Sequence, residues 1–229
     1  MRVQGLIDDG VTLVHTIPPS RVIWIVPSSV PAHRMAGQRG LGLSAVMLPI
    51  GPGFTVLAYL PAVGRPGASV LHLGCHGMVA DTAPGRSCLI LARDTELRVD
   101  AILRQASGRP PNASGGLVSL AACTSDVVAA EYDEALTPAT AFLAAGAVTV
   151  VGARWQVRDS HTMLLMFMFH YFMTHHACSP RDALRCAQQW MLDPCRTAPP
   201  EMPPELASHT RAGGLSKVIA WAAFVHQGR

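Results

Sequence analysis

Short apolar runs recur along the chain and alternate with stretches rich in glycine, proline and small polar residues. Each run is too short for most helices, and uninterrupted apolar character over a few residues is typical of a strand that is buried on both faces of a parallel sheet. Turn-forming residues bound most of these runs. We therefore predict strands at 21–27, 54–59, 69–74, 88–91, 116–122 and 147–152.

Patterns typical of helices fall between the predicted strands. Apolar residues within 96–105 recur with the spacing of a modest amphipathic helix. Thr137 and Pro138 form a good helix start, and Gly146 forms a good stop. A further helix is predicted over 180–191. The alternation of strands and helices predicts an α/β fold with a mostly parallel sheet that is covered by helices on both faces.

The most apolar segment, 163–173, is rich in methionine and phenylalanine. It is shorter than the ~18 to 20 residues that a membrane span needs, so we predict a buried helix and no membrane span. Asp159 or Ser160 can cap this helix. Because it is apolar on nearly every side, we expect the fold or another chain to cover it. The terminal run at 219–225 has the composition of an edge strand or a terminal helix.

The 229 residues, of which 49% are hydrophobic and only 14% are charged, predict one domain with a large core. We assign this core to residues 20–193 and 215–229. The segment between them, 194–214, contains five prolines and is predicted to be a mobile surface insert.

Composition and spacing exclude several classes of function. The net charge of +3 comes from scattered arginines, with Lys217 the only lysine, so we predict no nucleic-acid partner. The six cysteines follow no secretory signal, which predicts free thiols and a cytoplasmic location. His72, Cys75 and His76 have the spacing of metal ligands, but no matching Cys/His pair occurs elsewhere, so we predict no metal and no cofactor. Nothing in the sequence indicates an oligomeric state.

Two of the predicted strands end in residues that can carry chemistry. The strand at 116–122 leads into Cys123, and the strand at 69–74 leads into His76. Functional groups collect at the carboxyl ends of parallel strands, so we expect both side chains at one rim of the sheet. A cysteine with a pKa of ~8.5 is mostly protonated at neutral pH, and a neighbouring imidazole can take up its proton. Cysteine is also often only a small apolar packing residue.

A set of motifs resembles the CHAT domain, which belongs with the caspase-like cysteine peptidases of clan CD. The motifs are LHLGCHG at 71–77, LAACTS at 120–125, FLAAGA at 142–147, WQVRD at 155–159, PRDAL at 180–184 and WAAFVHQG at 221–228. The resemblance covers most of the chain from Arg21. It implies a caspase-like sandwich with a catalytic dyad of His76 and Cys123, and the separation of 47 positions is close to the ~50 of caspases. It also implies an oxyanion hole formed by the backbone N–H groups of Gly77 and Cys123.

The chain departs from the family in two places. The segment before the histidine strand, 61–69, is shorter than in most relatives, which leaves three explanations: a minimal core, an enzyme completed by a partner, or a degenerated copy. Thr124 stands where relatives often carry an acidic residue, while Ser125 fits the family.

The resemblance also implies where the substrate binds. In caspase-like folds the segment after the strand that follows the nucleophile strand lines the substrate pocket and pairs with the substrate backbone. That segment contains Arg154, Trp155 and Asp159, and an acidic group at Asp126 or Asp159 would favour a basic substrate residue. Purely structural roles explain these residues as well: Trp155 in the core, Asp159 as a helix cap and Asp126 in a turn.

Two functions remain open at this point. The first is a cytoplasmic, bacterial cysteine endopeptidase that cleaves a protein substrate and is regulated by an activating partner or a sensor. The second is a catalytically weak CHAT-like module for assembly or regulation. The presence of both His76 and Cys123 favours the enzyme, whereas the short segment at 61–69 favours the module.

Overall fold

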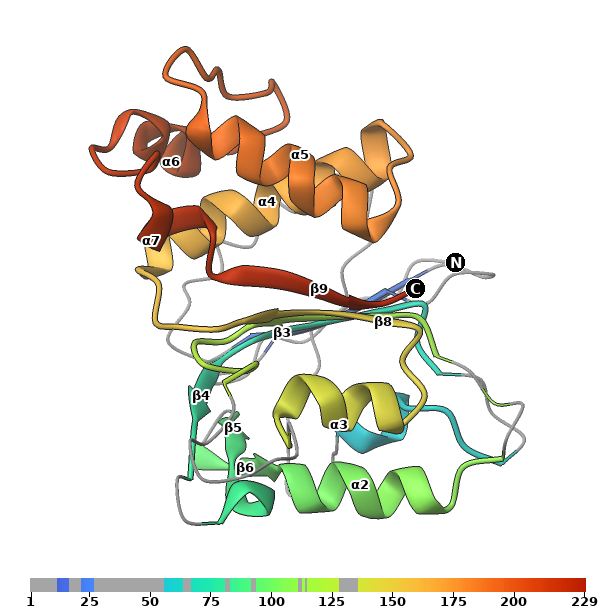
Figure 1. Cartoon of the computed structure of the whole chain (residues 1–229). Helices are drawn as coiled ribbons and strands as arrows, with labels where there is room; N and C mark the ends of the chain where they lie inside the picture. Colours follow the sequence, from blue (N-terminus) through green and yellow to red (C-terminus); the bar gives the residue numbers. More distant parts are fainter. Residues whose placement is uncertain are drawn as a thin grey trace.

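A six-stranded sheet forms the centre of the computed structural model (Figure 1). The structure describes residues 12–16, 22–26, 56–63, 67–80, 83–91, 94–110, 113, 115–127 and 136–229. The strands of this sheet are β1 (Thr12–Thr16), β2 (Val22–Val26), β3 (Val70–Gly74), β7 (Leu117–Ala121), β8 (Thr149–Ala153) and β9 (Phe224–Gly228). They lie in the order β1-β2-β3-β7-β8-β9, in which the central strands from β2 to β8 run parallel and the edge strands β1 and β9 run antiparallel to their neighbours.

Helices cover both faces of this sheet, as Figure 1 shows. Below it lie α2 (Val99–Ser107) and α3 (Pro138–Ala144), and above it lie α4 (Asp159–His175) and α5 (Pro180–Leu192). A small antiparallel sheet lies on the lower side and consists of β4 (His76–Met78), β5 (Cys88–Ile90) and β6 (Glu96–Arg98). The remaining elements are η1 (Val56–Tyr59), η2 (Pro84–Arg86), α6 (Pro204–Ala207), η4 (Ser208–Arg211) and α7 (Val218–Trp221). The predicted α/β fold, with a mostly parallel sheet between helices, is confirmed.

Alternation along the central strands divides the apolar side chains between two cores. In β7, Val118 and Leu120 pack in the lower core with residues of α2 and α3, whereas Leu117 packs in the upper core with residues of α4 and α5. Residues 164–169 of α4 are all buried, because the sheet lies on one side of this helix and α5 on the other. The buried helix predicted from its apolar surface is thus confirmed. Within the described residues, no helix combines the length and the hydropathy that crossing a bilayer requires.

The segment before β3 was predicted as a strand and is a helical turn instead. Residues 56–59 form η1, and the N–H of Leu60 donates to the Leu57 carbonyl oxygen at 3.2 Å. Residues 54 and 55 lie outside the described part of the chain. The strand nearest in sequence, β3, already pairs with β2 and β7, so no edge is left beside it for another strand.

Several element boundaries also differ from the predictions. The helix predicted from residue 96 begins at Val99, because the preceding residues pair with β5 as the strand β6. Neither Asp159 nor Ser160 caps α4: the N-cap residue is Arg158, and its side chain makes no capping hydrogen bond. The terminal run contains both of the predicted alternatives, since α7 is followed directly by the edge strand β9. The edge strand β1 was not predicted at all.

The proline-rich segment 194–214 packs against the upper helices. Met202 is 5% exposed and belongs to the upper core. The Arg196 guanidinium donates to the carbonyl oxygens of Met191, at 2.8 Å, and Thr210, at 3.1 Å. The predicted surface insert thus contributes a side chain to the upper core, while its mobility stays a prediction.

We expect Met202→Ala to lower the free energy of unfolding by about 2 kcal/mol, because it removes a buried side chain and leaves a cavity. The matched change Glu205→Ala, at an exposed position in α6, should alter it by less than ~0.5 kcal/mol. Urea unfolding of both variants measures the difference. Equally small effects would contradict the packing of this segment against the core.

Candidate active site

Cys123 lies in a tight turn that directly follows β7. This turn is fastened to the end of β8 by two hydrogen bonds: the Asp126 N–H donates to the Ala153 carbonyl oxygen at 2.9 Å, and the Ser125 hydroxyl accepts from the Ala153 N–H at 3.0 Å. Ser125 is fully buried. The turn is therefore held at the carboxyl ends of two parallel strands, where α/β proteins commonly place their functional groups.

Thr124, the residue after Cys123, adopts a left-handed backbone conformation. Its φ is 55°, which costs on the order of 1–3 kcal/mol for a β-branched residue. The Thr124 hydroxyl lies 2.7 Å from the carbonyl oxygen of Cys123 and 3.5 Å from that of Gly77. These contacts hold the strained turn against the segment that carries His76. Backbone strain of this kind clusters at functional sites.

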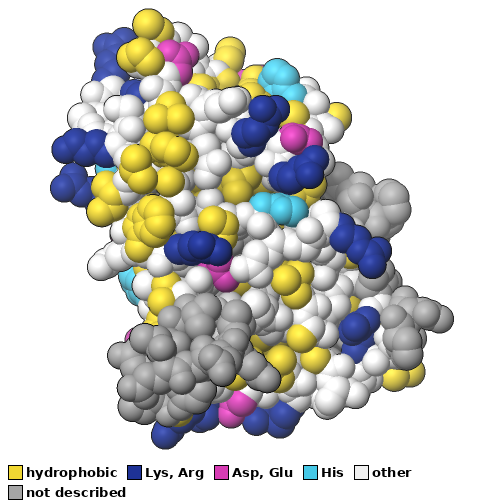
Figure 2. All heavy atoms as spheres, viewed as in Figure 1, with side chains coloured by type: hydrophobic (Ala, Val, Ile, Leu, Met, Phe, Trp, Pro, Cys, Tyr) yellow, Lys and Arg dark blue, Asp and Glu magenta, His cyan; other side chains and the backbone are white. Residues whose placement is uncertain are grey.

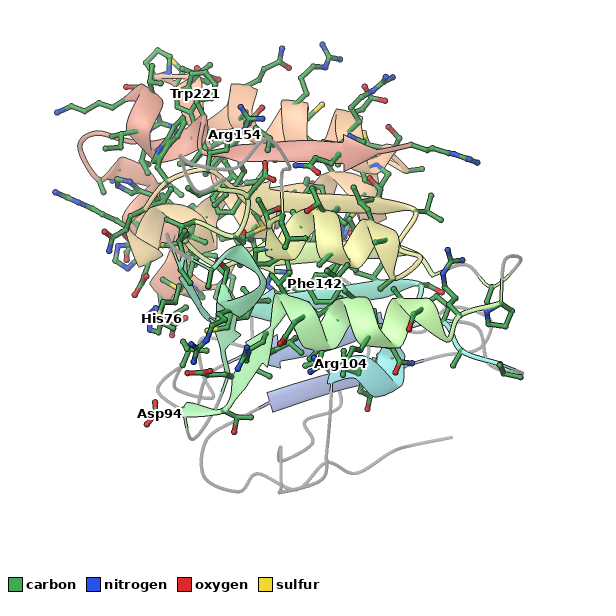
Figure 3. The ribbon with its side chains drawn as sticks, turned by 60° about the horizontal axis from the view of Figure 1, so that its bottom comes forward. His76, Asp94, Arg104, Phe142, Arg154 and Trp221 are labelled. Carbon is green, nitrogen blue, oxygen red and sulfur yellow. The ribbon has the colours of Figure 1, made fainter. Side chains whose placement is uncertain are left out.

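The chain at His76 lies next to the turn at Cys123. β3 pairs with β7, with Gly74 opposite Ala121, so the segments that follow these two strands leave the sheet side by side. The approach is closest at Gly77, where a Cβ atom would lie only 2.1 Å from the Cys123 carbonyl oxygen. The position thus requires glycine. Figure 3 shows His76 at the outer edge of the molecule, where β4 begins.

Cys123 is half-buried and His76 is exposed. The thiol donates a weak hydrogen bond to the carbonyl oxygen of Val157, with an Sγ···O distance of 3.7 Å. Among the described residues, this thiol makes no hydrogen bond to the His76 ring. Catalytic contacts of this type commonly tighten only when substrate binds.

The other two cysteines of this region, Cys75 and Cys88, are both buried. Burial raises the pKa of the Cys75 thiol to about 12, and the neighbouring Cys88 and Cys123 act in the same direction. A thiol with a raised pKa is a poor nucleophile, because little of it is present as thiolate. Of these three cysteines, Cys123 is the one that is not fully buried. All six cysteines of the chain are free.

Asp126 is buried and has three side-chain partners. Its carboxylate accepts hydrogen bonds from the Thr137 hydroxyl, at 3.4 Å, and from the amide of Gln227, and it pairs with Nε of Arg154 at 3.5 Å. The Asp126 side chain is only 4% exposed, whereas that of Arg154 is 60% exposed. The carboxylate thus stabilises the turn and holds a guanidinium at the rim. Thr137 and Gln227 were missed from the sequence, because they lie 11 and 101 positions from Asp126 and only the fold brings them together.

The other candidate substrate-binding residues lie in the segment after β8. Trp155 is half-buried, and its indole N–H donates to the Ile219 carbonyl oxygen at 3.2 Å. Asp159 is exposed as the first residue of α4. Between them, Val157 offers its carbonyl oxygen to the Cys123 thiol. Sequence reasoning missed Val157, because a contact made by a backbone carbonyl leaves no signal in the type of residue.

A buried histidine pair lies on the upper side of the sheet. His72 Nδ1 is 3.2 Å from the Ser119 hydroxyl and 3.1 Å from His170 Nε2. Burial lowers the pKa of His72 to about 3, and burial together with His72 lowers the pKa of His170 well below its usual value. His72 thus contacts α4, whereas Cys75 packs in the lower core. Among the described residues, no group of three or more His, Cys, Asp or Glu side chains could hold a metal ion.

We expect Ser125→Ala to lower the free energy of unfolding by about 1–3 kcal/mol, because it leaves the buried N–H of Ala153 without its hydrogen-bond acceptor. Ser107→Ala serves as the matched control, since that hydroxyl is exposed at the end of α2. Chemical unfolding measures both variants. An effect of Ser125→Ala no larger than that of the control would contradict a structural role for the Ser125 hydroxyl in holding the turn.

Comparison with known protein families identifies the family of this chain. The model of the CHAT domain family matches residues 37–229, which is most of the chain. A comparison with curated proteins found no match. The described fold, a mostly parallel sheet between two layers of helices, is consistent with a caspase-like architecture. The chain therefore belongs to the CHAT domain family, a caspase-like family.

Proposed function

We propose that this chain is a cysteine endopeptidase that cleaves a protein substrate with His76 and Cys123 as a catalytic dyad. The observation that carries the proposal is the close approach of Gly77 to the Cys123 carbonyl oxygen, because it brings the segment that carries His76 next to the half-buried Cys123. Membership of a caspase-like, peptidase-related family supports the same chemistry.

In the proposed reaction, His76 takes the proton of the Cys123 thiol, and the sulfur forms a bond to the carbonyl carbon of the scissile peptide. The carbon–nitrogen bond then breaks, and the imidazolium gives its proton to the departing amine. Water hydrolyses the resulting thioester and restores the thiol. The Gly77 and Cys123 N–H groups are the candidate donors to the oxyanion, and one such donor is worth roughly 3 to 4 kcal/mol in other acyl-transfer enzymes.

The proposed substrate contacts are Arg154 and Trp155, because both lie in the segment whose Val157 carbonyl meets the thiol. Asp126 acts by holding the guanidinium at the rim. Asp159 lies at the end of the same segment and contributes charge there.

We further propose that a partner or sensor protein controls this activity in a reducing, cytoplasmic setting, which six free thiols fit. In the rival proposal the chain is a catalytically weak assembly module, which would use the methionine-rich helix and exposed edges of the fold for its contacts. That helix is α4, and its apolar residues from Leu164 to Phe169 are buried between the sheet and α5. The burial of α4 favours the enzyme.

The proposal is tested by cleavage of unfolded β-casein and of the proteins encoded beside this chain. Wild-type protein should cleave at least one of them, and Cys123→Ala and His76→Ala should each lower the rate by at least ~100-fold. The control Cys195→Ala removes an exposed thiol and should leave the rate unchanged. Cleavage that persists in Cys123→Ala would contradict the proposal.

A further inference from the structure

Two adjacent apolar side chains on α7 face solvent. Both belong to a helix of a single turn, in which Val218 is 61% exposed and Ile219 is 62% exposed. Trp221, in the same turn, is half-buried. Figure 2 shows apolar side chains gathered at the left edge of this face, over α7. Isolated apolar side chains are common on protein surfaces, but a cluster of large ones marks a site of interaction.

This surface is joined to the segment that contacts the nucleophile. The Trp155 indole donates to the backbone carbonyl of Ile219 at 3.2 Å. Two residues further along, Val157 meets the Cys123 thiol. An extended chain that leaves the thiol along this segment would therefore run toward α7.

The charges around the surface are mostly positive. Arg154, Arg158 and Lys217 are exposed, and the neighbouring exposed carboxylate in the segments 154–159 and 216–221 is that of Asp159. Arg154 keeps 60% of its side chain exposed although its Nε faces Asp126. A ligand that combines apolar and acidic side chains would match both the apolar groups and this charge.

We propose that Trp155, Val218 and Ile219, together with Arg154 and Lys217, form a docking surface, the α7 platform, for the protein substrate itself. The substrate segment that binds there carries apolar side chains next to acidic ones. This inference rests on the proposed function and specifies its substrate class. The occupant is the substrate rather than a separate regulator, because Trp155 belongs both to the platform and to the segment beside the nucleophile.

The test measures binding in the full-length Cys123→Ala chain, which cannot cleave. The probe is a fluorescein-labelled peptide of alternating leucine and glutamate, followed by fluorescence anisotropy. Val218→Asp and Ile219→Asp should each weaken binding by at least about tenfold. The matched control is Val63→Asp, because Val63 is 78% exposed and does not belong to α7. This substitution should leave binding unchanged.

A second arm tests the charge. Lys217→Glu should weaken the binding of the leucine–glutamate peptide several-fold. It should strengthen the binding of a matched leucine–lysine peptide, because the substitution reverses the charge complementarity. In wild-type protein the leucine–glutamate peptide should also slow the alkylation of Cys123 by iodoacetamide, because the proposed path of the peptide passes the thiol.

Equal binding of the peptide to the Val218→Asp, Ile219→Asp and Val63→Asp variants would overturn the proposal. The absence of binding to the Cys123→Ala chain at about 1 mM peptide would overturn it as well, because even weak complexes have dissociation constants near this value. Binding that depends on the platform but leaves alkylation unchanged would assign the surface to a separate partner and overturn the substrate assignment. Since the binding arm needs no nucleophile, its failure is distinct from failure of the dyad, which would appear as reactivity independent of His76.

Discussion

Replacing Gly77 by alanine should lower the thermal midpoint by about 8 °C and abolish modification of Cys123. The new Cβ would lie 2.1 Å from the Cys123 carbonyl oxygen and 3.3 Å from its carbonyl carbon. Backbone atoms cannot rotate away, so the β4 segment and the Cys123 turn must separate. Overpacking of this kind costs on the order of 3 kcal/mol, and for a chain of this size that energy corresponds to about 8 °C.

Gly213→Ala is the matched control for this prediction, because a Cβ there would meet no heavy atom within 4 Å. It should leave both the thermal midpoint and the labelling of Cys123 unchanged. A Gly77→Ala variant with the midpoint and labelling rate of wild type would show that the two segments are not in contact, and the geometry of the proposed site would be wrong.

Acid should destabilise the protein through His72. Because burial lowers its folded-state pKa to about 3, the unfolded chain binds the proton more readily. The contribution of the neutral His72 to the free energy of unfolding is therefore fully present above the unfolded pKa of ~6.5. It is lost progressively as the pH falls toward 3. Between pH 7 and pH 5, the protonation of His72 alone should lower the free energy of unfolding by about 2 kcal/mol. His170, whose pKa is also lowered, should add to this loss.

Urea unfolding at pH 7 and at pH 5 measures this loss. His72→Gln retains a hydrogen-bonding side chain but does not titrate, so the difference between the two pH values should shrink by about 2 kcal/mol. Ser119→Ala is the control: it removes the partner 3.2 Å from His72 but retains both imidazoles, so the pH dependence should persist. An unchanged pH dependence in His72→Gln would contradict a neutral, buried His72.

Much of the fold follows from local patterns in the sequence. The runs that became β3, β5, β7 and β8 are short and apolar, and Thr137 with Pro138 starts α3 through the predicted capping. The errors arise where tertiary context decides. Residues 56–59 have strand-like composition, but the strand nearest in sequence, β3, is already paired on both sides. Residues 96–98 were predicted as part of a helix but pair with β5.

The candidate site shows the same division. His76 and Cys123 could be found from the sequence, because each follows an apolar strand in a recognisable motif. The residues that position them could not. The left-handed φ of Thr124, the carbonyl of Val157 and the convergence on Asp126 arise from backbone geometry and from contacts between distant segments.

The most direct test of the dyad is labelling by a peptidyl electrophile, with the modified cysteine identified by mass spectrometry. Wild-type protein should be labelled at Cys123. His76→Ala should slow this labelling by at least ~100-fold, since the thiolate loses its neighbouring base, and Cys123→Ala should remain unlabelled. Labelling at the same rate in wild type and His76→Ala, or labelling that persists in Cys123→Ala at another thiol such as Cys195, would contradict the dyad.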